Sequence, residues 1–147
     1  NAMKYITQKD LDVFIKRTLQ DKLTGGSDTK LDRVESQAMG TFRKYIGKRY
    51  DVDAIYSIQE DENGNDIRDP FVIKLLCHIM IYTLYSPYAP HDIPEHRKFD
   101  YQETMEFLRE VGRGDNDCDF KLKEVDVTDD LISEIKINSY PKINHRY

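Results

Sequence analysis

The sequence has no tryptophan, and it has only two cysteines, seven glycines and five prolines among its 147 residues. Cys77 lies in an apolar run and Cys118 in an acidic stretch, a spacing that excludes a disulfide framework and a cysteine-based metal knuckle. The composition of 39% hydrophobic and 33% charged residues, with so little glycine, excludes a disordered chain. These features indicate a helix-rich globular domain in a reducing compartment.

The motifs of common enzyme classes are missing as well. No serine lies in a Gly-x-Ser-x-Gly setting, and there is no glycine-rich phosphate loop. His91 and His96 straddle a proline-rich turn and lack the helical spacing of a zinc site. The acidic loop that begins at Asp61 lacks the glycine and the glutamate that a calcium loop requires. We therefore expect no catalytic residues, no metal, no cofactor and no small-molecule substrate.

The net charge of −5 argues against a general nucleic-acid binder, which needs a surplus of lysine and arginine. One dense basic cluster nevertheless follows a predicted helix and comprises Arg43, Lys44, Lys48 and Arg49. Cations at this position complement the negative C-terminal end of the helix dipole. The alternative function of the cluster is contact with DNA or with an acidic partner surface.

Hydrophobic periodicity predicts four helices in a single domain. The first follows the Thr7 cap and runs through Leu19, and the second follows Asp28 and runs through Ile46. The turn signal Asn63-Gly64 predicts a short hairpin between residues 56–58 and Ile67. The remaining predicted helices cover residues 70–85 and 94–111.

The clearest element is the third helix, from Pro70 to Tyr85. Asp69 and Pro70 form a typical start, with Asp as the N-cap and Pro at the first helical position. The residues that follow are apolar on almost every face, with Lys74 and His78 as the single polar edge. Its length of roughly 24 Å, followed by Ser86-Pro87 as an expected end, is short for a membrane crossing. We expect a buried core helix and no membrane contact.

The chain divides by composition near residue 114. Asn1 and Ala2 resemble the remnant of a cleaved tag, and no secretion signal is expected, so the predicted helical domain covers residues 3–114. Residues 115–147 form a predicted acidic C-terminal arm, irregular or with short extended pieces. The apolar residues that suggest these pieces are Phe120, Leu122, Val125, Val127, Ile135 and Ile137.

Several short motifs occur in a fixed order along the chain. They are Arg49-Tyr50-Asp51-Val52, Arg68-Asp69-Pro70, an apolar helix ending in Ile81-Tyr82-x-Leu84, Ile93-Pro94-Glu95-x-Arg97, and Tyr101. In this order and spacing, the chain resembles a Mu-like prophage family of small proteins encoded among head genes. That family is similar to the helical head-tail connector, or head completion, proteins of long-tailed phages.

The resemblance implies an all-α, four-helix connector-like bundle that acts as a virion structural subunit and not as an enzyme. Such a subunit would form a ring-like homo-oligomer beneath the portal, contact portal and tail proteins, and join the head to the tail. It would occupy the bacterial cytoplasm during assembly and then the virion. The expected ring interface combines the C-terminal arm, the basic cluster facing either DNA in the channel or an acidic neighbour, and the tyrosines Tyr82, Tyr85 and Tyr88.

An alternative function belongs to a different class. The chain would then be a small helical module that binds or regulates one host or phage protein, with no role in the virion. Portal, capsid and tail genes beside its gene favour the connector, whereas an isolated gene favours the module.

Overall fold

The computed structural model describes residues 3–88 and 90–124, and for Tyr88 the backbone alone. It confirms the predicted all-α class. Within the described residues there are six helices: α1 (Gln8–Phe14), α2 (Arg17–Thr24), α3 (Asp28–Ile46), α4 (Val52–Ser57), α5 (Pro70–Tyr88) and α6 (Glu95–Arg113).

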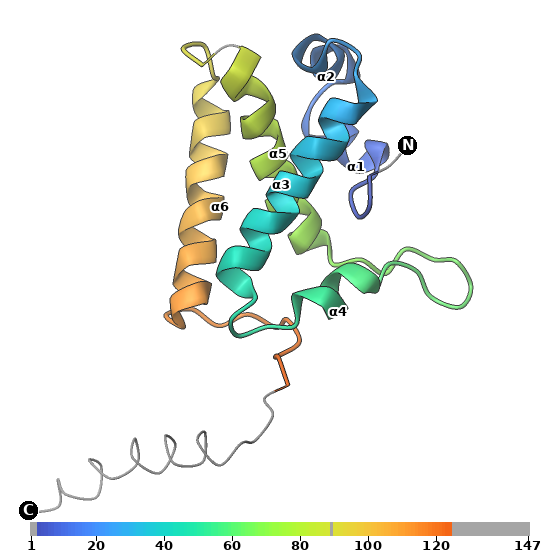
Figure 1. Cartoon of the computed structure of the whole chain (residues 1–147), viewed down its shortest axis with the longest axis vertical. Coiled ribbons are helices and arrows are strands. Elements are labelled where there is room, and N and C mark those ends of the chain that lie inside the picture. Colours follow the sequence, from blue (N-terminus) through green and yellow to red (C-terminus); the bar gives the residue numbers. More distant parts are fainter. Residues whose placement is uncertain (1–2, 89, 125–147) are drawn as a thin grey trace, which may run out of the picture.

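The three long helices form the body of the molecule (Figure 1). Helix α5 contacts both α3 and α6, which also contact each other, and α1 and α2 pack against α5. Helices α3 and α6 run in the same direction and α5 runs opposite to them, so α3 and α6 end at the same end of the molecule (Figure 1). The C-terminal ends of two helix dipoles therefore lie side by side.

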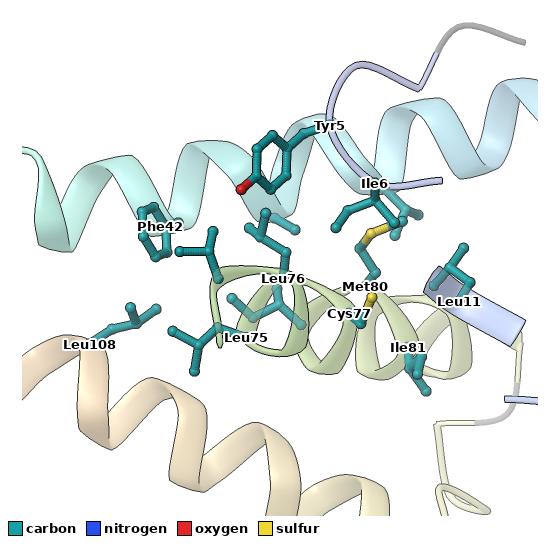
Figure 2. Close-up of a cluster of buried hydrophobic side chains, with 14 of the residues drawn as sticks. Tyr5, Ile6, Leu11, Phe42, Leu75, Leu76, Cys77, Met80, Ile81 and Leu108 are labelled. Atoms are coloured by element: carbon teal, nitrogen blue, oxygen red, sulfur yellow. The ribbon is translucent and has the colours of Figure 1, made fainter. Parts of the chain in front are cut away.

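Helix α5 is the core element that its sequence predicts. Asp69 caps it, because its carboxylate accepts the N–H of Phe71 at 2.9 Å and its carbonyl accepts the N–H of Ile73 at 3.1 Å. Figure 2 shows the side chains of α5 among those of the N-terminal segment, of α3 and of α6. The buried side chains of α5 are Val72, Leu75, Leu76, Cys77, Ile79, Met80, Ile81, Leu84 and Tyr85.

Burial on α5 explains both the protonation state of the Cys77 thiol and the apolar composition of the helix. Burial raises the pKa of Cys77 to about 12, so its thiol stays protonated and unreactive at neutral pH. Residues Pro70–Pro87 are long and apolar enough, by length and composition, to cross a membrane, but half of this stretch is buried inside the described structure. The packing on four neighbouring helices accounts for its apolar character.

The predicted end of α5 at Tyr85 is wrong, because the helix continues through Pro87 to Tyr88. A proline in the last turn of a helix forfeits only one intrahelical hydrogen bond, here the one to the carbonyl of Thr83. That loss is small beside the burial of Leu84 and Tyr85 in the preceding turn.

The predicted first helix is in fact two helices separated by a bend. The capping box of Thr7 and Asp10 starts α1 as predicted, but Ile15 and Lys16 have extended backbones. The side chain of Ile15 is buried, and its carbonyl accepts a hydrogen bond from the amide of the buried Gln20 at 2.9 Å. The burial of Ile15 and this local hydrogen bond stabilise the bend.

The predicted hairpin is wrong on its first side, because Tyr56 and Ser57 lie in α4. The carboxylate of Asp51 caps α4 by accepting the N–H of Ala54 at 3.0 Å. The predicted turn does exist further along, where Gly64 has φ 79° and the N–H of Ile67 bonds the carbonyl of Gln59 at 3.0 Å.

The first ten residues of the predicted arm lie against the helical domain. Phe120 is buried beside Tyr50, and an isolated antiparallel bridge joins Tyr50 to Leu122. The flanking hydrogen bonds run from the N–H of Asp51 to the carbonyl of Lys121 and from the N–H of Lys123 to the carbonyl of Arg49, at 2.8 and 2.9 Å. The predicted extended pieces at Val125, Val127, Ile135 and Ile137 lie outside the described residues.

Candidate functional site

A groove lies between the C-terminal ends of α3 and α6, and its volume is about 290 Å³. It is lined by four cationic side chains, one tyrosine and one glycine, which are Lys44, Lys48, Arg109, Arg113, Tyr45 and Gly112. We call it the basic groove. All four cations are exposed, and the lining contains no carboxylate. Two lie near the end of α3 and two in the last turns of α6, so helix packing brings them together.

A glycine sets the width of this groove. A Cβ atom placed on Gly112 of α6 would lie 2.6 Å from the carbonyl oxygen of Tyr45 in α3, a distance that no side chain tolerates. Glycine therefore allows the two backbones to approach closely. The close approach places the cations of one helix directly beside those of the other.

The cations of the groove are only partly neutralised. Among the described residues, Lys48 and Arg109 form no ion pair, and Lys44 lies over the ring of Tyr45 at 5.7 Å. Arg113 pairs with Asp115 at 2.9 Å on the exposed surface. The two helix dipoles offset part of this positive charge, because each presents about half a negative charge at its C-terminal end. The remainder attracts anionic groups.

Arg43 lies at the edge of the groove and not in it. Its guanidinium pairs with Asp53 of α4 at 2.7 Å, and this hydrogen bond raises the pKa of Arg43. The predicted cluster is thus divided: Lys44 and Lys48 belong to the groove, whereas Arg43 and Arg49 bind residues of their own chain.

Arg49 and Tyr50 hold the corner that follows α3. The guanidinium of Arg49 lies over the ring of Tyr50 at 5.5 Å and donates to the carbonyl of Val111 at 3.5 Å. The Tyr50 side chain is buried, and its hydroxyl accepts the N–H of Cys118 at 3.4 Å. These two motif residues therefore attach α3 to α6 and to the following chain.

Arg68 is the most extensively bonded of the predicted motif residues. Its side chain is 7% exposed and donates to both carboxylate oxygens of Asp10, at 2.6 and 3.2 Å. It also donates to the carbonyl of Tyr5 at 2.6 Å and to Asp66 at 2.7 and 2.9 Å. The two carboxylates raise the pKa of Arg68, so it remains a cation. Arg68 ties the N-terminal segment to the start of α5, beside Asp69 and Pro70.

The other predicted site residues lie at the opposite end of the molecule. Tyr82 of α5 stacks on Tyr101 of α6 at 4.0 Å between ring centroids, and Tyr85 is buried in the core. Pro94 is the N-cap of α6, and Arg97 donates to the carbonyl of Phe14 at 2.7 Å. The side chain of Tyr88 lies outside the described part of the structure.

A second hollow, of about 230 Å³, lies between α5 and α6 around His78. Burial lowers the pKa of His78, so its imidazole is neutral at pH 7, and its Nε2 lies 4.0 Å from Asp100 Oδ2. Thr104 Oγ1 lies 3.4 Å from His78 Nδ1 but donates to the carbonyl of Asp100 at 2.8 Å. Because that proton is directed to the backbone, this pair does not have the geometry of a nucleophile and its base.

Arg109 and Arg113 are the site residues that sequence reasoning missed. Each lies in the last turns of α6 before Gly114, the left-handed C-cap with φ 85°, just as Lys44 precedes the C-cap of α3. The available signal was a basic last turn followed by a C-cap glycine in both helices, with Arg43 and Lys44 before Gly47 in α3 and Arg113 before Gly114 in α6. The described residues contain no group of three or more side chains suited to hold a metal ion.

Comparison of the chain with protein-family models, with curated proteins and with solved structures finds no match in any of the three.

Proposed function

We propose that this chain is a structural subunit of a phage or prophage virion, of the head-tail connector or head completion kind. Its partners would be copies of itself and the portal and tail proteins. The order and spacing of the short motifs, which resemble those of Mu-like head-gene proteins, support the phage assignment.

The observation that carries the proposal is the asymmetry of charge. Four exposed cations converge in the basic groove of a chain whose net charge is −5. A subunit with one basic face and an acidic remainder favours head-to-tail contacts, because its groove attracts an acidic surface of a neighbour. Heterologous contacts of this kind close into rings when the rotation between subunits permits.

The positions of the motif residues also support a structural role. Arg49, Arg68 and Arg97 each donate hydrogen bonds to distant segments of their own chain, and Tyr50 is buried. A motif built from such residues stabilises a fold and is not typical of an active site. The helical domain then acts as a rigid support for the basic groove.

The proposal is tested by mixing the purified full-length chain with the portal protein encoded beside it. We expect native mass spectrometry to show a complex of defined subunit number, weakened by salt because exposed charges are screened. Lys48→Glu with Arg109→Glu should weaken portal binding by about tenfold or more, which is about 1.4 kcal/mol. Lys30→Glu, an exposed change at the far end of α3, is the matched control. No portal complex at low salt would contradict the proposal.

A further inference from the structure

The basic groove contains more positive charge than its own surroundings neutralise. Lys48 and Arg109 have no carboxylate partner among the described residues, and the carboxylate that pairs with Arg113 is 61% exposed. Exposed cations concentrated between two helix ends attract a ligand that presents several carboxylates together.

A segment of that composition follows directly in the sequence. Residues 124–134 contain five carboxylates and no lysine or arginine. The carboxylates are Glu124, Asp126, Asp129, Asp130 and Glu134.

The structure shows where this segment begins. The N–H of Lys123 bonds the carbonyl of Arg49 at 2.9 Å, and its Nζ lies 3.4 Å from the carbonyl of Gly47. Lys123 also lines a hollow of about 340 Å³. Lys44 and Lys48 of the basic groove line it too, as do the carboxylates of Asp51 and Asp53. Residue 124 therefore starts at the end of α3, beside the groove. Eleven extended residues span roughly 36 Å, which is ample reach.

We propose that residues 124–134 dock in the basic groove of their own chain. A short connection makes the effective concentration of the acidic segment millimolar, so modest affinity suffices to occupy the groove. DNA is a less suitable occupant, because the chain as a whole has a net charge of −5. The inference does not depend on the proposed function. A consequence is that an acidic partner must displace residues 124–134 from the basic groove before the partner binds there.

Zero-length carbodiimide cross-linking of the full-length chain tests the proposal, because this reagent joins lysine amines to carboxylates in contact. Peptide mapping should find Lys44 and Lys48 joined to carboxylates of residues 124–134. In a mixture of ¹⁵N-labelled and unlabelled chains, these products should pair peptides of the same isotope. We expect their yield to fall about fivefold at ~0.5 M salt, where the Debye length is only a few Å. Lys30 should give no such products, and it serves as the internal control.

Two variants make the test sharper. Arg109→Glu should lower the yield of the Lys48 products about fivefold by introducing a like charge, and Asp129→Lys in the same chain should restore it. Yields at Lys44 and Lys48 no higher than at Lys30 would overturn the proposal. Products of mixed isotope would assign the segment to a second copy and also overturn it. Binding of labelled duplex DNA through Lys48 and Arg109, with no cross-linked products from residues 124–134, would also overturn the proposal.

Discussion

Arg68 joins two parts of the chain through its own side chain. It bonds Tyr5 and Asp10 in the N-terminal segment and Asp66 before α5. Lysine is a single donor centre that cannot reproduce this planar, bidentate pattern. We expect Arg68→Lys to lower the free energy of unfolding by about 2–3 kcal/mol, because the largely buried Asp10 loses its bidentate hydrogen bonds. Urea denaturation measures this loss, and Arg33→Lys on the exposed side of α3 should change it little.

The hydrogen bonds of Arg68 should also make the stability of the protein depend on pH. These hydrogen bonds lower the pKa of Asp66 from 3.8 to about 2. A carboxyl whose pKa is lower in the folded state contributes stability above pH 4, and this contribution is lost as the pH falls toward 2. Wild-type stability should therefore decline between about pH 4 and pH 2, and the decline should be smaller in Arg68→Lys. Two other carboxyls also contribute to the decline: Asp12, held at a pKa of about 2 by Arg17, and Asp61, whose pKa is lowered by the hydrogen bond from Asn65. Equal slopes in both proteins would contradict this assignment.

Glu35 is a second buried charge with a structural function. Its side chain is fully enclosed and accepts the N–H groups of Lys4, Tyr5 and Ile6 at 2.7, 3.0 and 2.7 Å. Glu35→Ala leaves these donors without an acceptor, so we expect a loss of about 3 kcal/mol in the free energy of unfolding. Glu35→Gln, which retains one carbonyl acceptor, should lose less. The neighbouring Ser36→Ala is the control, and an equal effect of Ser36→Ala and Glu35→Ala would refute this role.

At the scale of elements, the close contact between α3 and α6 depends on one glycine. Gly112→Ala forces its Cβ against the carbonyl of Tyr45, so it should lower the free energy of unfolding by about 1–3 kcal/mol despite the better helix propensity of alanine. Gly40→Ala is the matched control, because open space surrounds its Cβ position in α3, and it should raise stability by about 0.5–1 kcal/mol. Thermal unfolding measures both, and two changes of the same sign would contradict this account.

Local signals in the sequence predicted some elements well. Helix α5 was predicted because Asp69-Pro70 is a strong start signal and because almost every face of the helix is apolar. The bend at Ile15 and the passage of α5 through Pro87 were not found. Both depend on burial against other parts of the chain, which overrides local propensity.

The sequence predicted only half of the candidate site, because the other half depends on contacts between distant parts of the chain. Lys44 and Lys48 are close in the sequence, so their cluster is visible there. Arg109 and Arg113 join them only because Gly112 lets α6 pack tightly against α3. Contacts between helices far apart in the chain are not encoded in any short pattern, so sequence reasoning missed this half.

At the scale of the whole molecule, stability and assembly should respond to different residues. Lys48 and Arg109 are exposed and unpaired within the described structure, so reversing their charges should change the free energy of unfolding by less than about 0.5 kcal/mol. The same changes should weaken binding to an acidic partner surface by about tenfold or more, which is about 1.4 kcal/mol. Arg68→Lys should do the opposite, lowering stability while leaving the groove intact. Comparison of denaturation and portal binding for both variants tests this separation.

The central claim, that this chain is a subunit of the virion, is tested most directly by quantitative mass spectrometry of purified virions from the strain that carries its gene. We predict that the chain is present in a fixed ratio to the portal protein and remains after stringent washing. Its absence from particles in which the portal, capsid and tail proteins are all detected would contradict the claim.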